Sequence, residues 1–295
     1  MENGREELKG TIGVRTDLAC EGKWGADGEE KTYALEGGGR VRVHRCRGEG
    51  GEQYVAFFCG RVTLLGEAVM GSLSLFLGRE IRRMAEQMLE RRLDSSVRVL
   101  AVGLGNPHMT ADAIGPETLR RATATRHLKE HDPEMYRALG CCEFSMFAPG
   151  VLGQTGIESG ELVRGAIERV KPHLLVAVDA LAARSCERLA STFQLSDTGL
   201  SPGAGVGNFR LPMNRESMGC PVLGVGVPTV VDSTTLVLDA LERAEISVEG
   251  HAKLETVLKN GRSFVVSPKD CDEILGITCR ILAKALDHAF GIGEL

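Results

Sequence analysis

The sequence predicts an α/β protein in which helices flank a mixed, largely parallel sheet, with a small N-terminal β-containing region. Two segments, Val97–Val102 and His173–Val178, are nearly continuous apolar runs, which is typical of parallel strands buried on both faces. Segments with apolar residues at helical spacing separate such runs along the chain. The 295 residues are enough for one large domain or two smaller ones with a sizeable core.

The N-terminal region is rich in Gly, Glu and Arg and contains three short runs that are typical of strands. These runs are Lys31–Ala34, Val41–His44 and Tyr54–Phe58. Apolar residues at helical spacing then predict a helix at Phe76–Leu93.

From residue 97 onward, strands and helices alternate. The expected strands are Val97–Val102, Phe144–Ala148, His173–Val178, Thr192–Ser196 and Pro221–Val225. The expected helices are Asp112–Thr123, Glu158–Val170, Asp232–Ala244 and Asp270–Phe290, the last beginning after Ser267-Pro268. Ligands of such sheets bind at the carboxyl ends of the strands.

Composition excludes several classes of protein. A net charge of −5 disfavours DNA or RNA as a direct partner. The chain has no run of eighteen apolar residues and its first ten residues contain no apolar core, so we expect neither a membrane span nor a signal peptide. Nine cysteines without a C-x-x-C pair fit reduced thiols in a cytoplasm. The seven histidines show no metal-ligand spacing, so we expect no metal and no cofactor.

The first candidate site residue is Asp112. The strand Val97–Val102 runs into Gly103-Leu-Gly105-Asn106, and Asp112 opens the next predicted helix. A dinucleotide-binding fingerprint needs a third glycine where this chain has His108, which disfavours nucleotide binding. Asp112 is then either a helix N-cap or a functional carboxylate, and both interpretations stay open.

The second candidate is Asp179, which directly follows five apolar residues and is expected at the ligand-binding edge of the sheet. A structural acid paired with Arg184 and a catalytic acid are both consistent with this position. If Asp112 and Asp179 converge, the two carboxylates share a proton. The ionised one can activate a water while the protonated one polarises a carbonyl, which is the chemistry of amide hydrolysis without a metal.

A third feature is Ser196-Asp197-Thr198-Gly199, which contains the Asp-Thr-Gly of pepsin-like proteases. Those enzymes need two copies in two β-rich lobes, and this chain has one in an α/β context. We interpret it as a turn after a strand, with Asp197 lining the site. Ser185 and Ser233 lack a Gly-x-Ser-x-Gly context, which disfavours a serine nucleophile.

Longer motifs in collinear order over residues 97–240 resemble the germination protease family of endospore-forming bacteria. The motifs are Gly103–Asn106, Thr110–Pro116, Thr125–Leu128, Ala148–Glu158, Asp179–Ser185, Gln194–Gly199, Pro202–Asn208 and Gly226–Asp232, and Ser267–Asp270 is also similar.

The resemblance implies an atypical, metal-independent aspartic endopeptidase that degrades small acid-soluble spore proteins in the spore core during germination. It also implies a fold related to hydrogenase maturation peptidases and a homotetramer. Asp112 and Asp179 stand where the family's proposed catalytic aspartates stand. Five residues of the matching motifs are the expected substrate-binding residues: Asn106, Glu158, Arg184, Asp197 and Asp232.

The family is made as a zymogen, and Val14–Glu21 is similar both to its processing site and to the Thr-Glu-Phe/Ile-Ala-Ser-Glu site of its substrates. We therefore expect cleavage between Asp17 and Leu18. Thr16–Glu21 would be a tethered pseudo-substrate at high effective concentration. The expected division of the chain is a propeptide (1–17), an N-terminal β-containing region with a connecting helix (18–95) and an α/β catalytic domain (96–295).

Two alternatives remain at this point. One is a hydrogenase-maturation-type peptidase, which would require a histidine near the carboxylates. The other is a non-catalytic peptide-binding module of the same fold.

Overall fold

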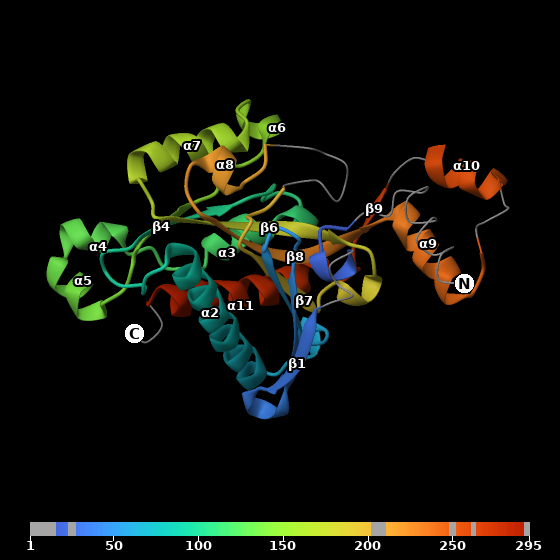
Figure 1. Ribbon diagram of the computed structural model, residues 1–295, viewed down its shortest axis with the longest axis horizontal. Helices are drawn as coiled ribbons and strands as arrows, with labels where there is room; N and C mark the ends of the chain where they lie inside the picture. Colours follow the sequence, from blue (N-terminus) through green and yellow to red (C-terminus); the bar gives the residue numbers. More distant parts are fainter. Residues whose placement is uncertain (1–15, 23–27, 202–210, 248–251, 261–263, 292–295) are drawn as a thin grey trace.

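The computed structural model describes residues 16–22, 28–201, 211–247, 252–260 and 264–291. Its centre is one nine-stranded sheet in the order β1-β2-β3-β7-β8-β6-β4-β5, with β9 paired to β8 (Figure 1). The strands are β1 (Glu29–Ala34), β2 (Arg40–Arg47), β3 (Gln53–Phe58), β4 (Arg98–Gly103), β5 (Glu143–Phe147), β6 (Leu174–Ala183), β7 (Thr192–Ser196), β8 (Val222–Asp232) and β9 (Val265–Val266).

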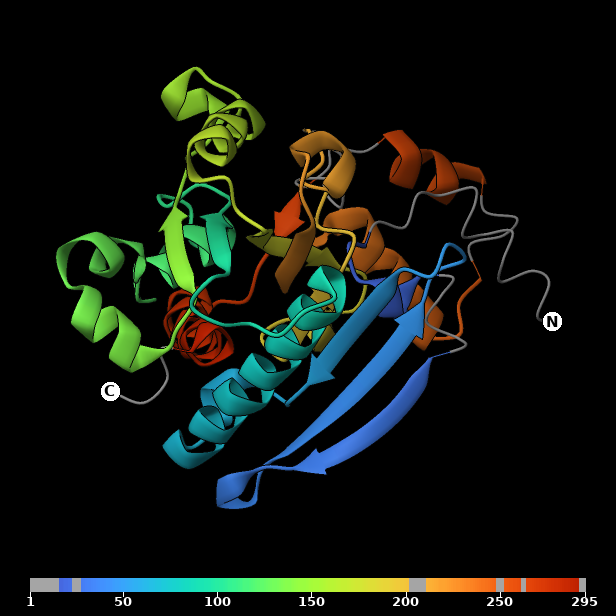
Figure 2. The ribbon, with the colours of Figure 1, turned by 60° about the vertical axis from the view of Figure 1, so that its left-hand side comes forward.

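The mixed α/β sheet expected from the sequence is confirmed. Its parallel part consists of β5, β4, β6 and β8, and the other pairings are antiparallel. The antiparallel share is larger than expected because β1, β2 and β3 continue the same sheet through the pairing of β3 with β7. Figure 2 shows these three blue strands side by side, with a teal helix, α2 (Glu67–Leu89), lying along them.

Helices cover both faces of the sheet. Figure 1 shows α7 (Ser159–Val170) and α8 (Arg215–Met218) on one side, with α2 (Glu67–Leu89) and α11 (Cys271–Phe290) on the other. The remaining helices are α3 (Ile114–Leu119), α4 (Arg126–His131), α5 (Pro133–Leu139), α6 (Leu152–Thr155), α9 (Ser233–Arg243) and α10 (Ala252–Asn260). The 3-10 turns are η1 (Ala19–Glu21), η3 (Glu36–Gly38), η4 (Val62–Leu64), η5 (Thr110–Asp112) and η6 (Cys186–Arg188).

The two faces of β4 and β6 bury different cores, because successive side chains of a strand point to opposite faces. Val99 and Val176 join the large cluster that α2 and α11 complete. Leu100 and Leu175 join the smaller cluster on the α7 and α8 side. Both faces of β4 and β6 are therefore buried away from solvent, which explains the continuous apolar runs in the sequence.

Most predicted elements are confirmed, with changed boundaries. The helix expected at Phe76–Leu93 begins at Glu67 and ends at Leu89. The helix expected at Asp112–Thr123 is divided into η5 and α3, so Asp112 lies in a 3-10 turn and Ala113 is the N-cap of α3. The strands predicted at His173–Val178 and Pro221–Val225 are longer, because β6 and β8 stay paired as far as Ala183 and Val231, past a bulge at Thr229.

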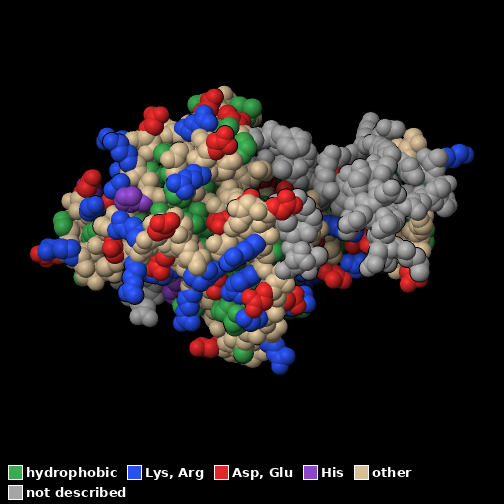
Figure 3. Space-filling view, in the orientation of Figure 1, with side chains coloured by type: hydrophobic (Ala, Val, Ile, Leu, Met, Phe, Trp, Pro, Cys, Tyr) green, Lys and Arg blue, Asp and Glu red, His purple; other side chains and the backbone are tan. Residues whose placement is uncertain are grey.

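Two sequence expectations lie outside the described residues, namely most of the propeptide (1–15) and the motif at 202–208. Over the described part of the chain, none of the helices combines the length and apolarity that a bilayer crossing requires. Figure 3 shows acidic and basic side chains interspersed on the visible face.

Candidate active site

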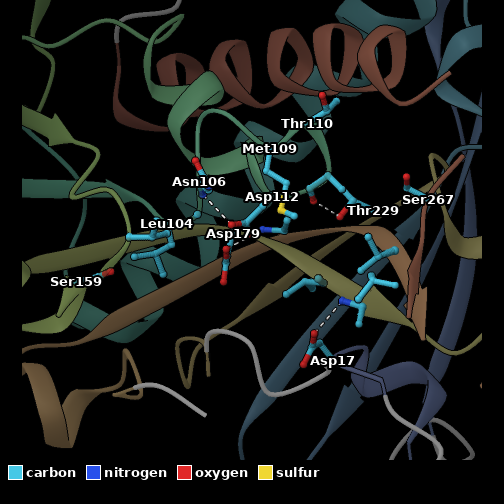
Figure 4. Close-up of a pocket in the computed structure, with 18 of the residues that line it drawn as sticks. Asp17, Leu104, Asn106, Met109, Thr110, Asp112, Ser159, Asp179, Thr229 and Ser267 are labelled. Atoms are coloured by element: carbon cyan, nitrogen blue, oxygen red, sulfur yellow. Dashed lines mark hydrogen bonds between the residues drawn. The ribbon is translucent and has the colours of Figure 1, made fainter. Parts of the chain in front are cut away.

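A pocket of about 650 Å³ opens at the carboxyl end of β4 and along the last residues of β6, beside β8. This is the edge at which ligands of parallel sheets bind. Figure 4 shows several of its polar side chains. The lining includes Asp17, Asn106, Met109, Thr110, Asp112, Glu158, Ser159, Asp179, Thr229 and Ser267.

The loop after β4 brings Asp112 to this pocket. Leu104 donates its backbone N–H to the carbonyl of Val178 over 2.8 Å, which fixes the start of the loop against β6. Asn106 then donates its backbone N–H to Oδ2 of Asp112 over 2.7 Å. Asp112 is therefore not the N-cap of α3; its carboxylate closes the loop that follows β4.

Two further contacts fix the turn η5 that carries Asp112. The Thr229 hydroxyl of β8 donates to the Ala111 carbonyl over 2.6 Å. The Thr110 hydroxyl donates to Oδ1 of Asp272, at the start of α11, over 2.8 Å. Hydrogen bonds with the β4 loop, β8 and α11 thus hold Asp112 and its turn in place.

Asp179 lies within β6 and not at its end, since the strand continues to Ala183. The sequence-based placement was correct in one respect. The pairing of β4 with β6 ends at Gly103 and Val178, so Asp179 is the first β6 residue beyond β4. Asp179 is only 4% exposed, and its Oδ1 accepts the backbone N–H of Ala180 over 2.9 Å.

The contacts of the β4 loop bring the two aspartates to the same wall of the pocket. Leu104 bonds to the residue before Asp179, and Asn106, two residues on, bonds to Asp112. The turn η5 also contacts β6 directly. Figure 4 accordingly shows the Asp112 and Asp179 side chains next to each other above the strand. Adjacent carboxylates that share one proton can act as a base and an acid.

Two of the five expected substrate-binding residues, Asn106 and Glu158, line the same pocket. The Asn106 side-chain oxygen accepts the backbone N–H of His108 and the amide of Gln154. Glu158 stands at the N-cap position of α7.

The other three expected binding residues lie outside the lining of this pocket. The Arg184 guanidinium pairs with Glu242. Asp197 accepts the backbone N–H of Gln53 over 2.8 Å, and its burial raises the pKa of the carboxyl. Asp232 is the N-cap of α9, where its Oδ1 accepts two backbone N–H groups. These side chains have structural contacts that the sequence pattern did not indicate.

The segment Thr16–Glu21 is docked beside the pocket. Asp17 donates its backbone N–H to the Ala182 carbonyl over 2.9 Å, and its Oδ2 accepts the Ala182 N–H over 2.8 Å. Gln194 of β7 donates to the Asp17 carbonyl and accepts the N–H of Ala19. Leu18 is 1% exposed and packs with Leu181. A peptide segment that ends in the turn η1 is therefore bound to the part of β6 that runs beyond β4.

Comparison with known proteins places the chain in a family. The sequence model of the germination protease family matches residues 69–245. A germination protease of Clostridium acetobutylicum is 34% identical to this chain, covering 94% of each sequence. The chain belongs to the germination protease family. Germination proteases of Caldanaerobacter subterraneus (35% identity, 96% of this chain and 95% of the relative) and Bacillus subtilis (35% identity, 78% and 66%) are also similar.

In this family member, sequence reasoning overlooked Thr229, Thr110 and Asp272, the residues that hold η5. Thr229 stands in the motif Gly226–Asp232, of which the sequence analysis assigned a role to Asp232 alone. A threonine carries no charge pattern that would distinguish it from its β-branched neighbours.

The described residues of this chain contain no group of three or more His, Cys, Asp and Glu side chains that could hold a metal ion. Cys141 and Cys142, which are neighbours in the sequence, offer no alternative nucleophile. Burial raises the pKa of Cys142 to about 12 and also raises that of Cys141, so both thiols are protonated near neutral pH.

Proposed function

We propose that this protein is an endopeptidase in which Asp112 and Asp179 activate a water molecule. The observation that carries the proposal is their shared position in one pocket, beside a strand edge that holds a peptide segment of the same chain. Membership of the germination protease family supports it. Hydrogen bonds from the backbone N–H groups of Asn106 and Ala180 position the two carboxylates before a substrate arrives.

The proposed reaction uses the pair as base and acid. The ionised carboxylate takes a proton from water, and the oxygen of that water attacks the peptide carbonyl carbon. The protonated carboxylate donates a hydrogen bond to the carbonyl oxygen and then transfers its proton as the tetrahedral species forms. Breakdown returns a proton to the amide nitrogen and releases a new amino terminus and a new carboxylate.

The docking of Asp17 on Ala182, with Leu18 in an extended conformation, supports the proposal that substrate residues next to the cleaved bond bind along β6. Adding a strand to an exposed sheet edge is a common mode of peptide recognition. In this proposal the chain is a zymogen that cleaves itself between Asp17 and Leu18, and the mature enzyme cleaves small acid-soluble spore proteins at similar sites in the spore core. The tetramer expected from the resemblance stays a prediction.

The docked segment suggests a resting arrangement. Ala182, which holds Asp17, lies three residues after Asp179, or about 10 Å along an extended strand. We propose that the segment shifts along β6 toward Asp179 before the bond is cut. This gives the zymogen a stable form that still keeps its own cleavage site at the pocket.

The test is to replace each aspartate by asparagine, which keeps the shape and removes the charge. Asp112→Asn and Asp179→Asn are each expected to lower the rate of self-cleavage at least about 100-fold. Mass spectrometry after incubation at mildly acidic pH would follow the appearance of a terminus at Leu18.

The matched control is Asp287→Asn, which alters a partly buried carboxylate at the other end of α11. Asp287 lies about 24 Å along the helix from Cys271 in the pocket lining, at about 1.5 Å per residue. Wild-type rates in both pocket variants would overturn the proposal. A comparable loss of self-cleavage in Asp287→Asn would show that the loss reflects misfolding and not the removal of a catalytic group.

A further inference from the structure

The strand β8 carries one extra residue where it pairs with β6. Leu181 lies opposite Pro228, but the next residue of β6, Ala182, lies opposite Val230. Thr229 therefore has no partner in β6, which makes this point a β-bulge. Such bulges are rare between parallel strands and common next to active sites, where they redirect a side chain. The residue whose direction this bulge sets is Thr229.

The bulge changes the face to which the side chains of β8 point. Leu223, Val225 and Val227 all join the large cluster on the side of α2 and α11. Val231 lies four residues after Val227, so a regular strand would place it on the same face. It packs instead with Leu18 of the docked segment, in the small cluster on the other face. One strand can thus support the turn η5 on one face and the docked segment on the other.

The position of the bulge costs the sheet few hydrogen bonds. On its other side, β8 pairs with β7 as far as Gly226 and with β9 only from Val231 onward. Among the described strands, β6 is thus the one partner of β8 around Thr229. Pro228 directly before it has no N–H to contribute to a strand pairing, and prolines within sheets are confined to edges and bulges. The bulge is therefore accommodated here without disturbing another pairing.

The Thr229 side chain lies on the α11 side of the sheet. It borders a small gap next to Ile114 and Ile274, and it also lines the pocket that holds Asp112. Only 8% of Thr229 is exposed, and its hydroxyl donates to the Ala111 carbonyl over 2.6 Å. Figure 4 shows this bond near Asp112. Thr229 thus acts on the chain one residue away from a carboxylate of the pocket.

The turn η5 depends on such outside contacts, because it is short and lacks a cap of its own. It has three residues, and within the described chain neither Met109 at its start nor Ala113, the N-cap of α3, makes a side-chain cap bond. A second bond to η5, from the Thr110 hydroxyl to Asp272, is exposed to solvent. A hydrogen bond shielded from water is electrostatically stronger. We therefore expect the bond from Thr229 to contribute more to holding the turn.

We propose that Thr229 is a positioning residue for Asp112, and that the β-bulge of β8 directs its hydroxyl to the turn η5. In this role the hydroxyl acts on Asp112 through the Ala111 carbonyl, and it keeps the carboxylate beside Asp179. The catalytic part of this inference rests on the proposed peptidase function. Its structural part, the hold on η5, is independent of any reaction.

The docked segment is held by a different set of contacts, so the two effects can be separated. Asp17 bonds to Ala182 of β6, and Gln194 of β7 bonds to the Asp17 carbonyl. Loss of the Thr229 hydroxyl should therefore weaken the hold on Asp112 and leave the segment docked. Docking corresponds to substrate binding and the cleavage rate to turnover, so we expect turnover to fall while binding stays unchanged.

The experiment compares two variants of the full chain. Thr229→Val keeps the branched shape and removes the hydroxyl, whereas Thr229→Ser keeps the hydroxyl. Thr229→Val is expected to slow self-cleavage at least about tenfold, because small displacements of a reacting group are costly to the rate. Thr229→Ser should cleave itself at a rate close to that of the wild type. Mass spectrometry would follow the appearance of the terminus at Leu18.

Amide hydrogen exchange measured by NMR gives a second readout, which requires no reaction. The Asn106 N–H, which bonds to Asp112, should exchange about fivefold faster in Thr229→Val, as expected for the loss of one hydrogen bond. The Ala182 N–H, which bonds to Asp17, should exchange at the wild-type rate, because the segment stays docked.

The control Thr278→Val alters a fully buried threonine of α11 whose hydroxyl has no hydrogen-bond partner among the described residues. It should match the wild type in both measurements. Wild-type cleavage or wild-type Asn106 exchange in Thr229→Val would overturn the proposal, and so would Thr229→Ser behaving like Thr229→Val. A wild-type chain that never cleaves itself would overturn the peptidase function, and the Asn106 exchange would still decide whether Thr229 holds Asp112.

Discussion

At the scale of single residues, the position of Asp112 depends on a glycine as much as on the acid itself. Gly105 has a φ of +109°, a conformation that side chains rarely adopt. A Cβ at this position would lie 1.9 Å from the Asp112 carbonyl oxygen. The close approach of the two backbone segments is what lets Asn106 reach the Asp112 carboxylate.

Gly105→Ala is therefore expected to displace η5 and to lower the rate of self-cleavage more than about tenfold. The added strain, of order 1–3 kcal/mol, should also lower the free energy of unfolding measured with urea. Gly165→Ala is the control, because a Cβ there meets open space and lies in the interior of α7. That variant should be as active as the parent and no less stable. An unchanged rate in Gly105→Ala would contradict the role of this contact.

At the scale of secondary structure, the sequence predicted the elements better than their connections. The apolar runs of β4 and β6 indicate strands that are buried on both faces, and the structure contains both strands. The β8 strand was predicted to end at Val225, too early, because Gly226 and Pro228 interrupt the apolar pattern after it. Those residues are accommodated by close neighbours and by a bulge, which only the sheet order creates.

The same limit applies to the candidate site. The position of Asp179 after an apolar run predicted its place at the ligand edge, and Asp112 followed from the strand before it. The sequence did not reveal that Asp232 caps α9, because an acid before a helix is compatible with either role. It also did not reveal that β3 pairs with β7, since that pairing joins segments more than a hundred residues apart.

The junction of β3 and β7 predicts a pH dependence of stability. Burial raises the pKa of Asp197 above its ordinary value of 3.8. Over the interval between the ordinary and the raised pKa, the folded state binds more protons than the unfolded state. Stability from this group is thus fully present below about pH 4 and is lost as the pH rises through the raised pKa.

Asp197→Asn removes that titration. The unfolding free energy of the wild type minus that of the variant is expected to fall as the pH rises above 4, which urea denaturation at a series of pH values would measure. Glu117→Gln should give the opposite slope in a lower window, with the difference falling as the pH drops below about 4.5, because hydrogen bonds from Arg120 and Arg121 lower the pKa of Glu117. A flat difference curve for Asp197→Asn would show that its carboxyl titrates normally in the folded protein.

At the scale of the whole molecule, one sheet brings together three parts of the chain. The segment Thr16–Glu21 bonds to β6 and β7, the strands β1 to β3 extend the sheet next to it, and the β4 loop supplies Asp112. Arg188, held over Phe58 of β3, connects the N-terminal strands to the docked segment. The N-terminal region is thus part of the surface on which the segment is bound, although the family model matches only residues 69–245.

This arrangement predicts that self-cleavage takes place within one chain, since the segment already lies on the β6 edge of its own pocket. The reaction should be first order, with a half-time that stays constant over a 100-fold range of protein concentration. A second measurement separates cleavage within a chain from cleavage between subunits of an oligomer. Wild-type chains and isotope-labelled Asp112→Asn chains would be co-expressed, so that any oligomer contains both. Only the wild-type chains should then acquire a terminus at Leu18. Cleavage of the labelled chains at the wild-type rate would mean that the pocket of one subunit acts on the segment of another.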